Sequence, residues 1–150
     1  MNAARAILAP SLDGVHLRDG RPEDADHVLS SMRTDFKKLW PYRSALDEPL
    51  LSKQLARLVP FLLSRSRLWV ADVSGAMAAY AIIDKHENLV HWARTAVPYR
   101  RMGLCGALLS TLSPGWRYSH DNAHAATVAK ALGGKFDPYA LVFLEAPHGL

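Results

Sequence analysis

Arginines and glycines gather in the segment 97–109, between an apolar stretch and an expected helix. Arg100 and Arg101 come first, and Gly103 and Gly106 follow. A helix start leaves backbone N–H groups without partners and carries a partial positive charge. Glycines let the backbone approach a bound group closely, and a phosphate is the usual guest of such a turn. The segment therefore predicts a site for a phosphorylated ligand.

The same segment has a plainer interpretation, an ordinary strand-to-helix turn with two solvated arginines. Cys105 is the only cysteine of the chain. At a helix start the pKa of a thiol falls, which makes Cys105 a candidate nucleophile. Because the sequence assigns it no histidine or acid as a partner, we expect it to be a small residue that fills the turn.

Two residues before this segment are candidates for receiving a proton. His91 interrupts an apolar stretch, and a histidine with an ordinary pKa suits a base that takes a proton from an ammonium group. Glu87, in the turn before that stretch, is a second candidate that would act through a bridging water. Each is equally explained as a polar residue on the surface or on a sheet face.

Two histidines later in the chain lie at a spacing that invites a metal interpretation. His120 and His124 are separated by a segment containing Asp121. Asn122 is a good N-cap and would place His120 outside the following helix, and a third ligand is not evident, so we expect no metal. His120 is instead a candidate proton donor, as are Tyr118, Ser119, His124 and Tyr139.

Composition bounds the class of protein. The chain has 150 residues, of which 49% are hydrophobic and 21% charged, as expected for one soluble globular domain. We expect no signal peptide and no membrane span, because no apolar run approaches ~18 residues. A single cysteine favours the reducing cytoplasm. The net charge of +4 favours anionic ligands, but basic residues without interleaved aromatics do not predict nucleic-acid binding.

Hydrophobic periodicity and turn residues define the expected elements. Their order is β-α-α-β-β-β-α-β-α-β, which predicts an α/β fold with a mixed sheet and helices on its faces. Pro60 is expected to kink or split the second helix. The domain is expected over 14–146, after a flexible lead-in at 1–13 and before a tail at 147–150. The expected strands are 15–18, 68–73, 76–84, 89–97, 116–119 and 139–144, and the expected helices are 22–36, 49–64, 104–112 and 122–132.

This order, together with Arg-Arg-Met-Gly-Leu-Cys-Gly at 100–106, resembles the GNAT superfamily of acetyl-CoA-dependent acyltransferases over about residues 15–145. The family's diphosphate loop reads Arg or Gln, two residues, Gly, one residue, then Gly or Ala. Arg100 and Gly103 match this pattern, whereas Cys105 does not, although it is small. The segment from Asn122 to Gly133 is similar to the family's late helix, and 18–24 to its opening strand and helix start.

The resemblance implies acetyl-CoA or another acyl-CoA as cofactor, held where strand 89–97 splays from strand 116–119. A primary amine of a small molecule or protein would attack the thioester directly. The diphosphate would rest on the backbone of 101–106, and Ala96 and Val97 would polarise the thioester oxygen. His91 or Glu87 would be the base, and His120 or Tyr139 the acid. The implied cofactor-binding residues are Ala96, Val97, Arg100, Arg101, Met102, Gly103, Leu104, Cys105, Gly106 and Asn122.

Two further departures from the family pattern leave an alternative open: the residue at position 129, and the connection 97–100, which is shorter than usual in the family. Ala129 falls where many family members carry the tyrosine that protonates the leaving thiolate, and alanine cannot be a general acid. The segments 118–121 and 133–139 are also similar to small GNAT-like proteins of bacteriophages and prophages. That likeness implies a catalytically degenerate structural or interaction protein of a phage particle, with other phage proteins as partners, in the virion or the cytoplasm of a bacterial host.

Overall fold

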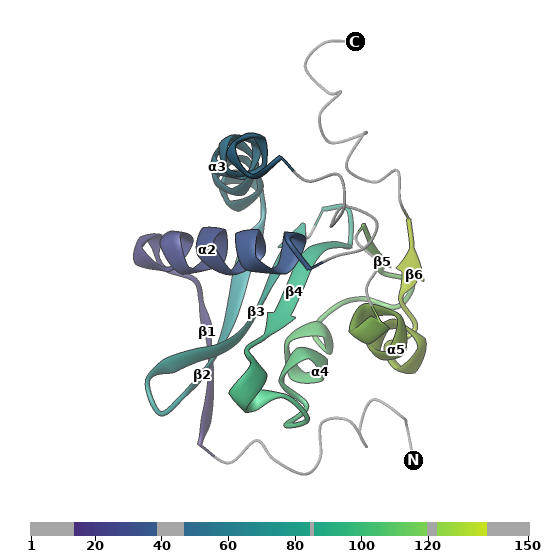
Figure 1. Ribbon diagram of the computed structural model, residues 1–150. Helices are drawn as coiled ribbons and strands as arrows, with labels where there is room; N and C mark the ends of the chain where they lie inside the picture. Colours follow the sequence, from purple (N-terminus) through teal and green to yellow (C-terminus); the bar gives the residue numbers. More distant parts are fainter. Residues whose placement is uncertain (1–13, 39–46, 85, 120–122, 138–150) are drawn as a thin grey trace. The chain divides into compact units, whose positions relative to one another are not determined.

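The computed structural model describes residues 14–38, 47–84, 86–119 and 123–137, and the side chains of 123–125 lie outside this description. The chain divides into two compact units. One unit is Gly20–Ser66, and the other combines Met1–Asp19 with Arg67–Leu150. The labels of the elements are those in Figure 1. The smaller unit is helical, and the larger unit contains every strand that the structure describes.

The larger unit is built on a six-stranded mixed sheet in the order β1-β2-β3-β4-β5-β6. The first four strands pair antiparallel, and β5 and β6 add to the sheet in parallel. This confirms the predicted α/β class with a mixed sheet. The strands are β1 (Val15–Asp19), β2 (Arg67–Val73), β3 (Ala76–Asp84), β4 (Leu89–Thr95), β5 (Arg117–Tyr118) and β6 (Lys135–Phe136).

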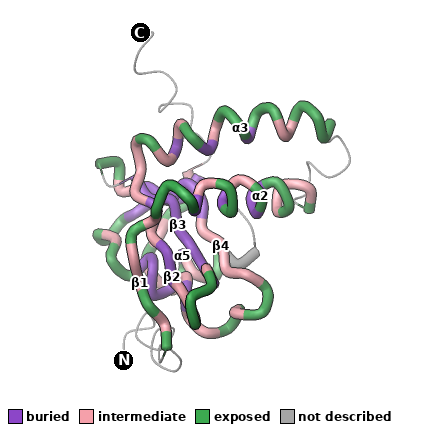
Figure 2. Tube along the Cα trace, turned by 90° about the vertical axis from the view of Figure 1, so that its left-hand side faces the viewer, coloured by how far each residue is buried: buried purple, intermediate pink, exposed green. Residues whose placement is uncertain are grey.

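The central strand β3 is buried on both of its faces, from Ala78 to Asp84, as its purple colour shows in Figure 2. A strand covered on both sides reads as a nearly continuous apolar run, which is the pattern of its sequence. One face forms a core with Leu104 and Leu108 of helix α4 (Leu104–Leu109). Helix α4 packs on β2, β3 and β4, so the loop before it is anchored to the middle of the sheet.

Helix α4 is shorter than the predicted helix over 104–112. The hydroxyl groups of Ser110 and Thr111 donate to the carbonyls of Ala107 and Leu108, at 2.8 and 3.1 Å. Such side-chain bonds offer the backbone an alternative to the helical ladder and favour its end.

Helix α5 (Ala123–Leu132) ends at the predicted pair of glycines. Gly133 has φ +80°, the left-handed conformation that glycine adopts without strain. The N–H of Gly134 then donates to the carbonyl of Ala129 at 2.8 Å, which satisfies the end of the helix. The chain turns directly into β6, so a strand forms before the predicted strand at 139–144, which lies outside the described residues.

The helical unit contains the short 3-10 helix η1 (Pro22–Asp24), α2 (Ala25–Phe36) and α3 (Glu48–Arg65), and α2 packs against α3. Asp47 caps α3 by accepting the N–H of Leu50 at 2.9 Å. Pro60 does not split α3, which runs on to Arg65. Both Pro60 and Ala56, whose carbonyl loses its partner, are exposed, so water can satisfy that carbonyl.

None of the helices in the described ranges is both long and apolar enough to cross a membrane.

Candidate functional site

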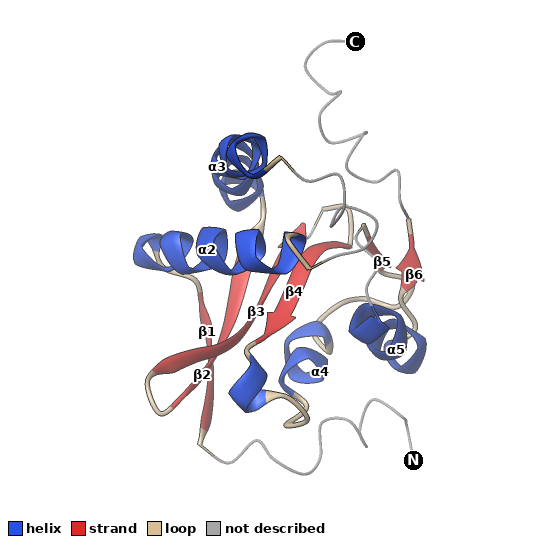
Figure 3. Cartoon of the chain, viewed as in Figure 1, coloured by secondary structure: helices blue, strands red, loops and turns tan. Residues whose placement is uncertain are grey.

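Strands β4 and β5 lie next to each other (Figure 3), and their described pairing is short. The register joins Leu89 to Arg117 and Val90 to Tyr118. The last ladder bond runs from the N–H of Ser119 to the carbonyl of Val90, at 3.2 Å. Strand β4 continues to Thr95 without a β5 partner among the described residues. The separation of the two strands that the resemblance implies would begin at residues 120–122, which lie outside the described residues.

A β-bulge lies in β4 next to the last described pair of β4 and β5. On the other side of β4, Trp92 pairs with Ile82 and Val90 pairs with Ile83, so His91 is the extra residue between them. A bulge bends its strand and increases the local twist. The bend therefore coincides with the end of the β4–β5 ladder and sets the direction of the remaining residues of β4.

The bulge also decides which backbone groups of β4 remain free. The N–H of Ala96 donates to the carbonyl of Ala78 at 2.8 Å, so Ala96 faces β3. Hydrogen-bonding direction alternates along an antiparallel strand. The N–H and C=O groups of Ala93 and Thr95 therefore face away from β3, on the side of β4 where β5 pairs with Leu89 and Val90. We call these outward-facing groups of Ala93 and Thr95 the open edge. The expectation that Ala96 polarises a thioester oxygen is wrong, because its N–H is already bonded.

Next to the open edge, a row of backbone amides is free. The N–H groups of residues 101–106 donate to no acceptor within the described part of the chain, and the first helical bond runs from Ala107 to Gly103 at 3.0 Å. Arg101 and Gly103 have φ values of +69° and +78°. Backbone turns of this left-handed kind align successive N–H groups into anion-binding concavities. Arg100 and Arg101 are both exposed beside this row, which we call the amide row.

Cys105 joins the amide row to the open edge. Its thiol lies 3.0 Å from the hydroxyl of Thr95. Burial raises the pKa of the Cys105 thiol above its ordinary value, and the hydrogen bond with Thr95 lowers this pKa by less. A thiol kept neutral is a poor nucleophile, so the geometry favours Cys105 as the small residue that fills the turn.

The raised pKa of Cys105 predicts that the folded protein loses stability at alkaline pH. Because the unfolded thiol ionises first, near its ordinary pKa of about 8.5, this contribution is complete below that pH and is lost as pH rises through the folded pKa. We expect Cys105→Ser to remove this part of the decline. Urea unfolding of both proteins at pH 7 and pH 10 measures it, and an identical decline would contradict the assignment.

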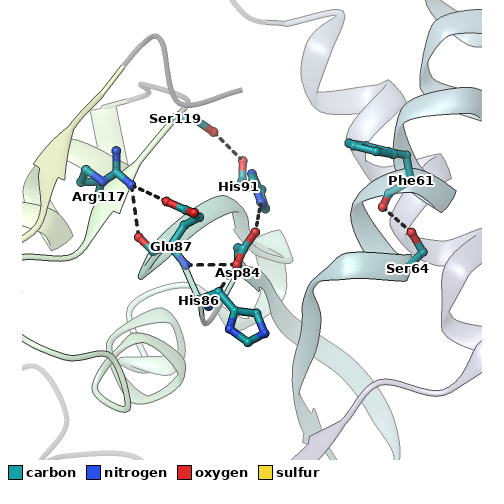
Figure 4. Close-up of polar contacts among 8 residues, drawn as sticks. All are labelled: Phe61, Ser64, Asp84, His86, Glu87, His91, Arg117 and Ser119. Atoms are coloured by element: carbon teal, nitrogen blue, oxygen red, sulfur yellow. Dashed lines mark hydrogen bonds and ion pairs between the residues drawn. The ribbon is translucent and has the colours of Figure 1, made fainter. Parts of the chain in front are cut away.

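His91 was expected to be an accessible base that receives the proton of the amine, but the structure buries it. It is fully buried, and its Nε2 lies 3.9 Å from Oδ2 of Asp84, which is buried as well (Figure 4). The other oxygen of Asp84 accepts the N–H groups of His86 and Glu87 at 3.1 and 3.2 Å. The imidazole therefore lies beside Asp84 in the buried part of the sheet, and this burial depends on the packing around the strand rather than on its local sequence.

Glu87 is bound to Arg117 of β5 (Figure 4). One guanidinium nitrogen of Arg117 lies 3.2 Å from the carbonyl of Glu87 and 3.4 Å from its carboxylate, and the other donates to Asp137 at 2.7 Å. The Glu87 side chain is 53% exposed, so it can still exchange protons with water. Arg117 ties together the turn before β4, β5 and the residue after β6.

The remaining candidates on β5 and α5 are only partly described. His120, Asn122 and Tyr139 lie outside the described residues. Ser119 is buried, and its hydroxyl donates to the carbonyl of His91 at 3.4 Å. Ala129 is buried in the core of the larger unit. In the described ranges, no group of three or more His, Cys, Asp or Glu side chains is arranged to hold a metal ion.

Sequence reasoning located the amide row and missed three features beside it: Asp84, the bulge and the outward-facing groups of Ala93 and Thr95. The interruption of the apolar stretch by His91 was the available signal of the bulge. The direction of the β4 backbone groups had no signal, because it depends on pairing with β3.

Comparison with known proteins gives likenesses to solved structures. One is described as "a possible acetyltransferase from Clostridium difficile 630", with 15% identity, 88% of each chain covered and a TM-score of 0.47. A transcriptional regulator from Bacillus halodurans C-125 is 16% identical over 91% of this chain and 93% of that chain, with a TM-score of 0.44. A "putative acetyltransferase of the GNAT family" from Desulfovibrio desulfuricans is 16% identical over 87% and 80%, with a TM-score of 0.40. No family model and no curated protein matches the chain.

Proposed function

We propose that this chain is a GNAT-type N-acyltransferase that binds acetyl-CoA or another acyl-CoA and transfers the acyl group to a primary amine. One observation carries the proposal: the open edge of β4 leads directly into the amide row of residues 101–106. An open edge pairs with amides of an extended ligand, and a row of N–H groups holds phosphates. Acyl-CoA has both groups on one flexible arm.

The residues present fit the two parts of this ligand. The N–H and C=O groups of Ala93 and the N–H of Thr95 face away from β3 and match the amides of a pantetheine arm, whereas the Thr95 carbonyl accepts a bond from Arg100. The amide row and the exposed guanidinium groups of Arg100 and Arg101 supply donors and positive charge for a diphosphate. The net charge of +4 acts in the same direction.

Bound acyl-CoA supplies an activated acyl group that an amine can take over directly, with the thiolate as leaving group. The chain's main contribution is to hold the two reactants in position, which alone can supply several orders of magnitude in rate. The N–H of Ala93 belongs to the open edge and could polarise the oxygen of an acyl group bound there. Glu87, with its exposed carboxylate, is the better candidate to receive the amine's proton through water. His120 and Tyr139 stay the candidate proton donors.

A thermal shift with CoA tests the binding step. A ligand at 100 times its Kd stabilises the folded state by about 2.7 kcal/mol, which corresponds to a rise in Tm of roughly 5–10 °C for a domain of this size. Pyrophosphate and GTP at equal concentration are matched controls without a pantetheine arm, and we expect smaller shifts from them. An unchanged Tm at millimolar CoA would overturn the proposal.

A second candidate function keeps the binding site without the transfer. It is favoured by Ala129, which is buried in the core and offers no proton donor, and by the complete burial of His91. In that case the chain is a structural or interaction module, with proteins of a phage or a bacterial host as partners. Release of thiol from acetyl-CoA in the presence of lysine peptides and small primary amines separates the two candidates. Binding of CoA without thiol release would favour the module.

A further inference from the structure

Arg100 contacts the open edge that the ligand is proposed to occupy. Its Nε donates to the carbonyl of Thr95, at a distance of 3.4 Å. This carbonyl is one of the β4 groups that face away from β3. The backbone holds Arg100 close by, because its N–H donates to the carbonyl of Val97 at 3.3 Å. One guanidinium group therefore lies between the open edge and the amide row.

We propose that Arg100 is a specificity-determining residue that favours thioesters carrying a diphosphate over bare pantetheine thioesters. This inference rests on the proposed function. The contact of Arg100 with Thr95 covers part of the edge on which a pantetheine arm would pair. A carbonyl oxygen can accept two hydrogen bonds, so the guanidinium is displaced by a ligand that approaches the Thr95 carbonyl along the line of the Arg100 contact.

The two kinds of ligand differ in the hydrogen bonds that they offer to the displaced guanidinium group. A diphosphate offers the guanidinium a charge-assisted hydrogen bond that replaces the weaker bond to a neutral carbonyl. A pantetheine thioester without the diphosphate displaces Arg100 and gives it no new partner. Specificity of this kind comes from a penalty on the wrong ligand as well as from attraction to the right one.

Arg101 provides an internal comparison. It is the next residue, it is equally exposed, and it makes no hydrogen bond or ion pair within the part of the chain that the structure describes. Arg101 can attract a diphosphate but does not cover the open edge. The two arginines should therefore differ in their effect on a ligand that has no phosphate.

The experiment measures Kd for CoA and for pantetheine with the wild type, Arg100→Ala and Arg101→Ala, by titration followed with NMR. Both variants should raise the Kd for CoA by about tenfold, the effect of losing one charged hydrogen bond. Arg100→Ala should lower the Kd for pantetheine by about threefold, the effect of one weak neutral hydrogen bond. Arg101→Ala should leave the Kd for pantetheine unchanged. Arg100→Lys, which keeps the charge but has no Nε donor, should tighten pantetheine and retain most of the CoA affinity.

The outcomes separate this inference from the function on which it rests. If Arg100→Ala leaves pantetheine affinity unchanged or weakens it, while the wild type binds CoA, the specificity role is overturned and the proposed function stands. If the wild type binds neither ligand, both are overturned. Unchanged amide spectra away from residues 95–106 show that each variant is folded.

Discussion

Reversing both charges beside the amide row, with Arg100→Glu and Arg101→Glu, is expected to abolish the rise in Tm caused by CoA. Both guanidinium groups are exposed and adjoin N–H groups that have no acceptor in the described part of the chain. Each charge-assisted hydrogen bond to a phosphate contributes about 1.5–3 kcal/mol. Loss of both, with added repulsion, should raise Kd at least about 100-fold. Differential scanning fluorimetry and calorimetric titration measure the two effects.

A matched double variant tests whether this loss is specific to the site. Lys130→Glu with Lys135→Glu changes the net charge by the same amount, and both lysines are exposed on α5 and β6. We expect this protein to keep its response to CoA within about threefold, because salt screens exposed charges that belong neither to the amide row nor to the open edge. Equal losses in the two double variants would point to general attraction, and no loss in the first would place the diphosphate elsewhere.

Replacing Gly134 by alanine is expected to cause a large loss of stability. A Cβ at this position would lie 2.5 Å from two atoms of the Trp116 ring. That indole cannot easily move, because it is 2% exposed and its Nε1 donates to the carbonyl of Leu132 at 3.3 Å. Overpacking of this kind costs about 1–3 kcal/mol, and each kcal/mol lowers Tm by roughly 2–4 °C in a domain of this size. Thermal and urea unfolding measure the loss.

The neighbouring glycine serves as the control for this prediction. Gly133 has φ +80° but open space around the position of a Cβ, so Gly133→Ala should cost only the backbone strain of about 1 kcal/mol. Adding Trp116→Leu to Gly134→Ala should restore part of the packing, which a double-mutant cycle detects as coupling. Equal losses for the two glycine variants, without coupling to Trp116, would show that the clash is not the cause.

Local sequence signals predicted most of the elements, because their causes lie within a few residues. The hairpin turn at Ser74-Gly75, the end of α5 at Gly133 and the amide row around Gly103 all follow from the conformations that short segments favour. Pro60 was expected to kink or split α3 and does not split it, since whether a lost hydrogen bond ends a helix depends on whether water reaches the freed carbonyl. That depends on exposure, which is a tertiary property.

The candidate site divides in the same way. Local sequence patterns were enough to locate the glycine-containing turn at 100–106 and the order of strands that brings it to the end of β4. Three features became visible only in the tertiary structure. A bulge at His91 shifts the register of β4, and Ala93 and Thr95 rather than Ala96 have backbone groups that face away from β3. Glu87 is bound to Arg117. These features depend on pairing between segments distant along the chain. A bulge is an extra residue relative to the partner strand, so it cannot be recognised from the alternation of one strand alone. No local sequence pattern could therefore have predicted these features.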